Sequence, residues 1–196
     1  FEMEFYLLDG KEDGQFSSLR YIAEEPVSAT NVLSITDLDS NEIFFNYLYR
    51  VCAEFGIPME GISSENAPRQ FEINLKHVDN PLIAADHAAF FKRFIKGIAK
   101  QHKKRATFMA KPFPKISGSG MHVHMSLLDK DGNNVFNNNT DLGSDTLKHA
   151  VAGILENMAD STLILAPHFN SYKRLRPGTH APLNICWGYE NRTAAV

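Results

Sequence analysis

The feature that most constrains this chain is an alternation of apolar and polar residues that recurs in three short segments. Residues 1–8 read FEMEFYLL, residues 70–77 read QFEINLKH, and residues 120–129 read GMHVHMSLLD. A β-strand turns residues i and i+2 to the same face, so each segment predicts a strand with one apolar and one polar face. We therefore expect a sheet that carries polar side chains at defined positions.

The polar faces of these strands carry side chains of the kinds that bind metal ions in proteins. Together with one glutamate from the loop before the second strand, they are Glu2, Glu4, Glu65, Glu72, Asn74, His122 and His124. Neighbouring carboxylates repel each other unless solvent or a cation lies between them. A solvated edge strand explains any one segment, but the recurrence in three segments favours a cation site. Carboxylates with an imidazole suit Mg²⁺ or Mn²⁺, whereas Zn²⁺ recruits more His or Cys.

A basic loop near the C-terminal end offers the complementary charge. Its cations, with one arginine further on, are Lys173, Arg174, Arg176 and Arg192. Arginine and lysine bind carboxylate or phosphate, although such a run is also typical of a solvated loop. Two divalent ions opposite these cations would suit phosphoryl transfer. The chain has neither GxxxxGK[ST] nor a GxGxxG that opens a helix, so no nucleotide-binding fingerprint supports this.

The remaining pattern alternates strands with helices. Helices are expected from the capping pair Asp39 and Glu42 to Gly56, from Asn80 to about His102, and after Ser144. The expected strands are residues 1–8, 59–68, 70–77, 106–112, 120–129, 183–188 and 192–196, with a turn at 129–134 and further turns and short strands within 10–37. This order predicts one α+β unit whose strands outnumber its helices and are mostly antiparallel.

Composition excludes several classes of protein. A net charge of −3 gives no reason to expect a nucleic-acid partner, and no apolar run approaches the roughly 20 residues of a membrane span. We expect a soluble, cytoplasmic protein in which Cys52 and Cys186 are reduced thiols. Because the chain begins with Phe1 in full strand alternation, it also reads as a piece of a longer protein.

With these residues assembled, the sequence resembles the catalytic domain of the glutamine synthetase family. The segments that carry the resemblance, in order, are FEMEF, ENAPRQFE, ATFMAKP, GSGMHVHMSL, NSYKRLRPG and WGYENRT. The resemblance implies an α+β fold, with a mostly antiparallel, curved β-sheet and flanking helices. It makes residues 1–196 a catalytic domain truncated at both ends, without the family's N-terminal β-domain and the C-terminal part of the catalytic domain.

The resemblance also implies an activity, in which ATP phosphorylates the γ-carboxylate of glutamate and a nitrogen nucleophile then takes the γ-glutamyl group. The expected cofactors are ATP and two or more Mg²⁺ or Mn²⁺ ions. The metal ligands would be His122 with Glu2 at one ion, and Glu4, Glu65 and Glu72 at the other. The nucleotide residues would be Glu60, His124, Ser126 and Arg192, and the glutamate residues would be Glu4, Ser117, Gly118 and Arg174. The family's sites lie between subunits of a ring, so we expect a ring-shaped homo-oligomer and an isolated piece that is inactive.

Three residues depart from the family pattern. Arg69 stands where the family commonly has Gly beside the metal carboxylates, and it would crowd the site or add a charge contact. Ser117 stands where ammonia-using members often have Asn. His180 in PGTHAP stands where bacterial ammonia-using enzymes typically have a Glu that binds ammonium, so a base toward a bulkier amine is a further role for it, beside Arg174 and Arg192 in catalysis.

His180 and the segments ENAPRQFEINL, NSYKRLRPGTHAP and WGYENRT favour the γ-glutamylpolyamine synthetase branch, with an ammonia-using glutamine synthetase as the alternative. A catalytically idle scaffold or regulatory relative is a second alternative, and Arg69 is its best support. A carboxylate-metal phosphohydrolase would share the metal ligands but would not need glutamate. In each active case the partners are small molecules: glutamate, ATP, and an amine or ammonia.

Overall fold

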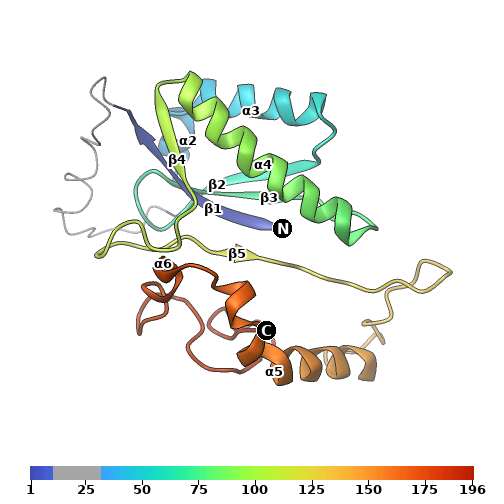
Figure 1. Cartoon of the computed structure of the whole chain (residues 1–196). Coiled ribbons are helices and arrows are strands. Elements are labelled where there is room, and N and C mark those ends of the chain that lie inside the picture. Colours follow the sequence, from blue (N-terminus) through green and yellow to red (C-terminus); the bar gives the residue numbers. More distant parts are fainter. Residues whose placement is uncertain (11–31) are drawn as a thin grey trace. The chain divides into compact units, whose positions relative to one another are not determined.

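The computed structural model describes residues 1–10 and 32–196, which form two compact units, Phe1–Val123 and His124–Val196 (Figure 1). Each unit is described by itself. The turns and short strands expected within 10–37 lie mostly outside the described residues; the described part of that segment begins the short helix α2 (Ile35–Asp39).

The first unit is built on an antiparallel sheet whose centre is β1 (Glu2–Asp9). The other strands are β2 (Met59–Ser64), β3 (Gln70–Leu75), β4 (Lys104–Thr107) and β5 (Met121–His122). The strand order is β2-β3-β1-β4, and β5 pairs with β1 beside β4. The open antiparallel sheet confirms the expected fold class, and it brings three sequence-distant strands into contact with β1.

One face of this sheet is covered by α3 (Glu42–Glu54) and α4 (Pro81–Gln101) (Figure 1). The apolar positions of the two central strands point to these helices: Met3, Phe5 and Leu7 from β1, and Phe71, Ile73 and Leu75 from β3. Strand alternation then sends the polar positions to the opposite face. That face holds a smaller buried cluster made of Tyr6, Leu8, Ala67, Phe113 and Ile116. The same alternation therefore builds the core and leaves the polar side chains on the other face.

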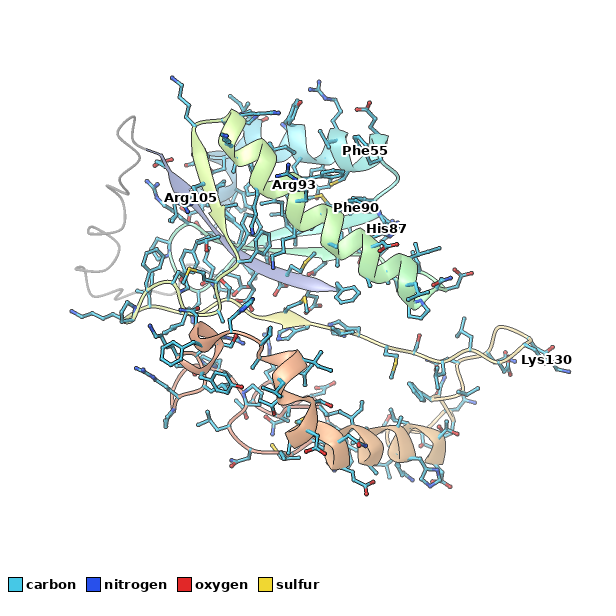
Figure 2. The ribbon with its side chains drawn as sticks, in the orientation of Figure 1. Phe55, His87, Phe90, Arg93, Arg105 and Lys130 are labelled. Carbon is cyan, nitrogen blue, oxygen red and sulfur yellow. The ribbon has the colours of Figure 1, made fainter. Side chains whose placement is uncertain are left out.

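All three expected helices are formed, and two of the three expected N-terminal caps are confirmed. Asn80 caps α4 by accepting hydrogen bonds from the amides of Leu82 and Ile83, and Ser144 caps α5 (Asp145–Leu165) through the amide of Leu147. The expected capping box of Asp39 and Glu42 is wrong, because Asp39 ends α2 and α3 starts after Asn41, whose side chain makes no capping bond. Figure 2 labels Phe55, which follows α3, and Phe90 on α4; both side chains are more than half exposed, and the ring centroid of Phe55 lies 4.9 Å from that of Phe94 on α4.

Several predicted strands differ from the structure in extent, and two of them are not formed. The ladder expected over 106–112 lies earlier, at Lys104–Thr107, and that expected over 120–129 is confined to Met121–His122. In the second unit the turn at 129–134 folds the chain back, as expected, through an isolated bridge between Leu128 and Asn134. Residues 183–196 form turns instead of the two expected strands, although the Cys186 carbonyl accepts from the amides at 195 and 196.

The second unit also contains α6 (Phe169–Tyr172). Counted over residues 1–10 and 32–196, strands do not outnumber helices, and the expected single unit is divided into two. Cys52 and Cys186 are both free, as expected. No helix in the described part of the chain combines the length and apolar character that a membrane span requires.

Candidate metal centre

The register of the sheet gathers acidic and imidazole side chains around the first residues of β1. Glu2 lies opposite His122 on β5 and opposite Asn74 on β3, and Glu4 lies opposite Glu72. The ligand atoms of Glu2, Glu72 and His122 all lie within 4.8 Å of one another. Nδ1 of His122 is 3.0 Å from Oε2 of Glu2. Three strands therefore supply one group of ligands, as the alternation predicted.

Glu72 carries the electrostatic signature of this centre. Its pKa is raised from the ordinary value of 4.5 to about 7, first by burial and then by the negative charges of Glu65, Glu2 and Glu4. His122 acts in the opposite direction. Burial and the neighbouring carboxylates together thus make Glu72 resist ionisation, and a cation between the carboxylates would relieve the repulsion.

The donor set fits a hard divalent cation. Two carboxylates and one imidazole, without a thiolate, suit Mg²⁺ or Mn²⁺ and leave coordination positions for water or phosphate. Oδ1 of Asn74 is buried and, among the described residues, has no hydrogen-bond partner. It is a neutral oxygen of the kind these ions accept, next to Glu2 in the register. The alternation placed Asn74 on the polar face with the expected ligands, but the family resemblance assigned it no role.

The other expected residues of the first unit surround this group. Glu65 lies in the turn between β2 and β3, where its amide donates to the Gln70 carbonyl at 2.8 Å. Glu60 lies on β2 and is exposed. Ser117 and Gly118 lie in the loop between β4 and β5, and the Ser117 carbonyl accepts from the Tyr6 hydroxyl at 2.6 Å.

Glu4 is tied to this loop through a residue that the sequence patterns did not single out. Gln70 is 1% exposed and donates from Nε2 to Oε2 of Glu4 at 3.0 Å and to the Gly118 carbonyl at 2.9 Å. It lies on the polar face of β3, two residues before Glu72. Its position in the alternation was a signal, but an uncharged amide gave no reason to single it out.

Five expected residues belong to the second unit: His124, Ser126, Arg174, His180 and Arg192. The basic loop there is folded around Thr179, whose hydroxyl donates to the carbonyls of Arg174 and Arg176 at 2.7 and 2.6 Å. Nε of Arg174 is buried and has no hydrogen-bond partner within the described ranges. The ladder stops at His122, so His124 lies beyond the strand, and the side-by-side projection of the two imidazoles stays a prediction.

Arg69 adds a charge contact, one of the two expected effects. Its guanidinium pairs with Asp9 at the end of β1, and Asp9 also accepts from Lys104 at 2.9 Å. Burial opposes ionisation of Asp9, but the bonds from Lys104 and Arg69 outweigh it and hold its pKa below the usual range. Arg69 has a φ of 64°, the left-handed region that glycine adopts readily, which explains why a glycine suits this turn.

We expect Arg69→Gly to change the free energy of unfolding by less than about 1 kcal/mol, because loss of a half-exposed ion pair is offset by relief of the left-handed strain. Arg69→Val should destabilise by about 1–2 kcal/mol relative to Arg69→Gly, since a β-branched residue is poorly tolerated at positive φ. Urea denaturation of both variants checks this. Equal stabilities of the glycine and valine variants would contradict the backbone explanation.

Comparison with known proteins adds sequence and fold. The model of the glutamine synthetase catalytic domain matches residues 1–196. The γ-glutamylputrescine synthetase PuuA of Escherichia coli (strain K12) is 38% identical over 198 residues, covering 100% of this chain and 42% of that protein. A glutamine synthetase of Halobacterium salinarum is 38% identical over 200 residues, covering 100% of this chain and 42% of that protein.

A solved structure, the GmaS complex with ADP, is 28% identical with a TM-score of 0.80, and covers 98% of this chain and 45% of that chain. The chain thus spans less than half the length of these relatives. The family match extends over every strand that contributes a residue to the candidate metal group. The chain therefore belongs to the glutamine synthetase family and matches the catalytic domain of that family along its whole length.

Proposed function

We propose that the protein is an ATP-dependent ligase that phosphorylates the γ-carboxylate of glutamate and transfers the γ-glutamyl group to an amine. The observation that carries this proposal is the convergence of Glu2, Glu72 and His122 within 4.8 Å, in a chain of the glutamine synthetase family. A scaffold protein has no need to bury a carboxylate beside Glu65, Glu2 and Glu4, an arrangement that raises the pKa of Glu72 to about 7. That arrangement supports an active ligase over the idle relative.

The chemistry divides into two steps with stated roles. In the first, an oxygen of the γ-carboxylate attacks the γ-phosphorus of ATP, which gives an acyl phosphate and ADP. In the second, the amine nitrogen attacks the acyl carbon, phosphate leaves, and a base takes the proton from nitrogen. We assign Glu4, Ser117, Gly118 and Arg174 to glutamate, Arg192 to the transferring phosphate, and His180 to the proton.

A second group of residues is assigned to the metal ions. Glu2, Glu72 and His122 would bind Mg²⁺ or Mn²⁺, with Glu4 and Glu65 available for a second ion. The ions, when bound, neutralise phosphate charge. Glu60, His124 and Ser126 are assigned to the nucleotide. We further propose that the complete protein assembles as a ring-shaped homo-oligomer in the cytoplasm and that the chain of 196 residues by itself turns over little or no substrate.

The acceptor is the finer part of the proposal. His180 supports a primary amine such as a polyamine, because a neutral imidazole removes a proton from a bulky amine but does not attract ammonium as a carboxylate does. A relative named for putrescine is as similar to the chain as one named glutamine synthetase, each at 38% identity. Ammonia is therefore the second candidate acceptor.

The test measures ADP release by the protein expressed from its complete gene, with ATP, glutamate and Mg²⁺, and with either putrescine or ammonium. Faster release with putrescine, and a γ-glutamyl product by mass spectrometry, is the expected result. Faster release with ammonium and formation of glutamine would replace the acceptor but keep the ligase. ADP release that does not depend on glutamate would favour a phosphohydrolase and reject the proposal.

A matched pair of variants links the activity to the site. Glu2→Gln should reduce glutamate-dependent ADP release at least about 100-fold, because it removes a charged metal ligand. Glu54→Gln, the same substitution at an exposed position on α3, should leave it within about two-fold. Equal activities of these two variants would reject the assignment of the metal centre. Absence of any thermal stabilisation by Mg²⁺ with an ATP analogue would favour the scaffold.

A further inference from the structure

Gln70 is an uncharged side chain that is buried on the polar face of the sheet. Although it is polar, it is 1% exposed. Nε2 donates to Oε2 of Glu4 at 3.0 Å and to the Gly118 carbonyl at 2.9 Å, while Oε1 accepts from the Ala67 amide at 3.2 Å. A buried amide is stable only when its donors and its acceptor are satisfied, and these three contacts do so.

These partners allow only one orientation of the amide. Turning the group over would place its oxygen against two acceptors, the Glu4 carboxylate and the Gly118 carbonyl. It would also point the NH₂ group at the Ala67 amide, which is a donor. Gln70 therefore acts as a fixed bridge between a strand and a loop, with no freedom to exchange its partners.

The loop that Gln70 holds is also anchored just before Gly118 in the chain. The Ile116 carbonyl accepts from Nζ of Lys111 at 2.5 Å, and the Ser117 carbonyl accepts from the Tyr6 hydroxyl at 2.6 Å. Tyr6 lies directly opposite Gln70 in the sheet register, and the two side chains donate to the adjacent carbonyls of residues 117 and 118.

The loop then returns to the strand that carries Glu4. The Glu4 amide donates to the Gly120 carbonyl at 3.1 Å. Glu4 is thus joined to this loop twice, through its own backbone and, by way of Gln70, through its side chain. Movement of the loop relative to the Glu4 carboxylate has to break one of these links.

The two groups that Gln70 holds together have the chemistry of an ammonium site. A carboxylate oxygen and a carbonyl oxygen, both within 3.0 Å of one nitrogen, each keep further lone pairs that accept hydrogen bonds. A primary ammonium offers three donors and a positive charge, which matches a carboxylate beside a carbonyl. The separation and direction of the two acceptors decide how well both reach the same cation.

We propose that Gln70 is a positioning residue for the amino-acid substrate: by bridging Glu4 and Gly118, it sets the spacing of two acceptors that bind the α-ammonium group of glutamate. This inference rests on the proposed function, in which Glu4 and Gly118 hold glutamate. It assigns Gln70 no contact with ATP or with the reacting atoms. Loss of the bridge therefore weakens glutamate binding more than it affects nucleotide binding.

The test uses Gln70→Met in the protein expressed from its complete gene, since methionine keeps the length of the side chain and removes the amide. The KM for glutamate should rise about ten-fold or more, because the charged acceptor loses a donor, whereas the KM for ATP should change less than about two-fold. Cys52→Ala is the control: Cys52 lies on α3 in the core on the helical face of the sheet, opposite to the face that carries Gln70, so its substitution should change neither KM.

A second variant covers the case in which Gln70→Met does not fold. Gln70→Asn keeps the amide but is one methylene shorter, so it cannot make all three bonds and should raise the KM for glutamate by a smaller factor in the same direction. Wild-type KM values for glutamate in the folded variants, or equal rises for glutamate and ATP, would overturn the inference alone. A wild-type protein that does not use glutamate would overturn the proposed function, and the inference with it.

Discussion

Glu72→Gln is expected to remove the stabilisation of the protein by Mg²⁺ or Mn²⁺ and, at the same time, to stabilise the metal-free protein at pH 8. At a metal concentration 100 times the dissociation constant, wild-type protein should gain about 2.7 kcal/mol from binding, and the variant should gain almost none. Without metal, glutamine removes a negative charge that lies among Glu65, Glu2 and Glu4. After allowance for solvent screening, this should be worth about 1–2 kcal/mol.

The direction of the pH dependence follows from the raised pKa of Glu72. A carboxyl whose pKa is about 7 in the folded protein and near 4.5 when unfolded favours folding while it is protonated. Its contribution is complete below about pH 4.5 and is lost as the pH rises to about 7. The metal-free wild type should therefore lose stability across this range relative to Glu72→Gln, and metal binding should strengthen across the same range.

Thermal denaturation at pH 5 and pH 8, with EDTA or with excess Mg²⁺, measures both effects. Glu54→Gln serves as the control, because Glu54 is an exposed glutamate on α3 and should behave as wild type in all four conditions. If metal-free Glu72→Gln is less stable than wild type at pH 8, then the burial and repulsion of the ionised Glu72 carboxylate do not destabilise the folded protein as expected.

Phe71→Ala is expected to cost about 3–5 kcal/mol in the free energy of unfolding, the range for a large aromatic removed from a packed core. Phe71 is 0% exposed, and its ring centroid lies 4.9 Å from that of Phe45 and 6.1 Å from that of Phe5. It stands on β3 between Gln70 and Glu72, so the side chains on either side of it belong to the polar face. Because the metal site exists only in the folded sheet, the Phe71→Ala variant should also bind metal more weakly.

Urea denaturation followed by circular dichroism measures this loss. Phe90→Ala is the matched control, since Phe90 is 56% exposed on α4 and its removal should cost less than about 1 kcal/mol. Similar midpoints for the two variants would mean that the sheet does not pack on α3 and α4 through Phe71.

The alternation in residues 1–8 and 70–77 predicted β1 and β3 because both strands are covered by helices on one face, which is the condition that produces alternation. It failed for residues 120–129. In the register only Met121 and His122 pair with β1, opposite Met3 and Glu2. Alternation indicates which residues of a segment share a face, but it does not reveal how many of them form hydrogen bonds to a neighbouring strand.

The membership of the metal group was likewise only partly predictable. Alternation tells which residues share a face, but the register between strands decides which faces meet. The family pattern separates His122 and Glu2 from Glu72, whereas the structure brings these three together. Gln70 and the positive φ of Arg69 could not be recognised from the patterns, because a buried amide carries no charge and a left-handed residue leaves no periodicity.

The position of β1 between its partners has a consequence for how the chain folds. A slip of one residue would turn Glu2 and Glu4 toward α3 and α4, and Met3 and Phe5 toward the ligands. A sheet with this one-residue slip would then have neither the apolar core nor the cation site. A divalent ion binds only the correctly paired form, and by mass action it enriches that form during assembly. The cation would in this way select the correct strand register before it takes part in any chemistry.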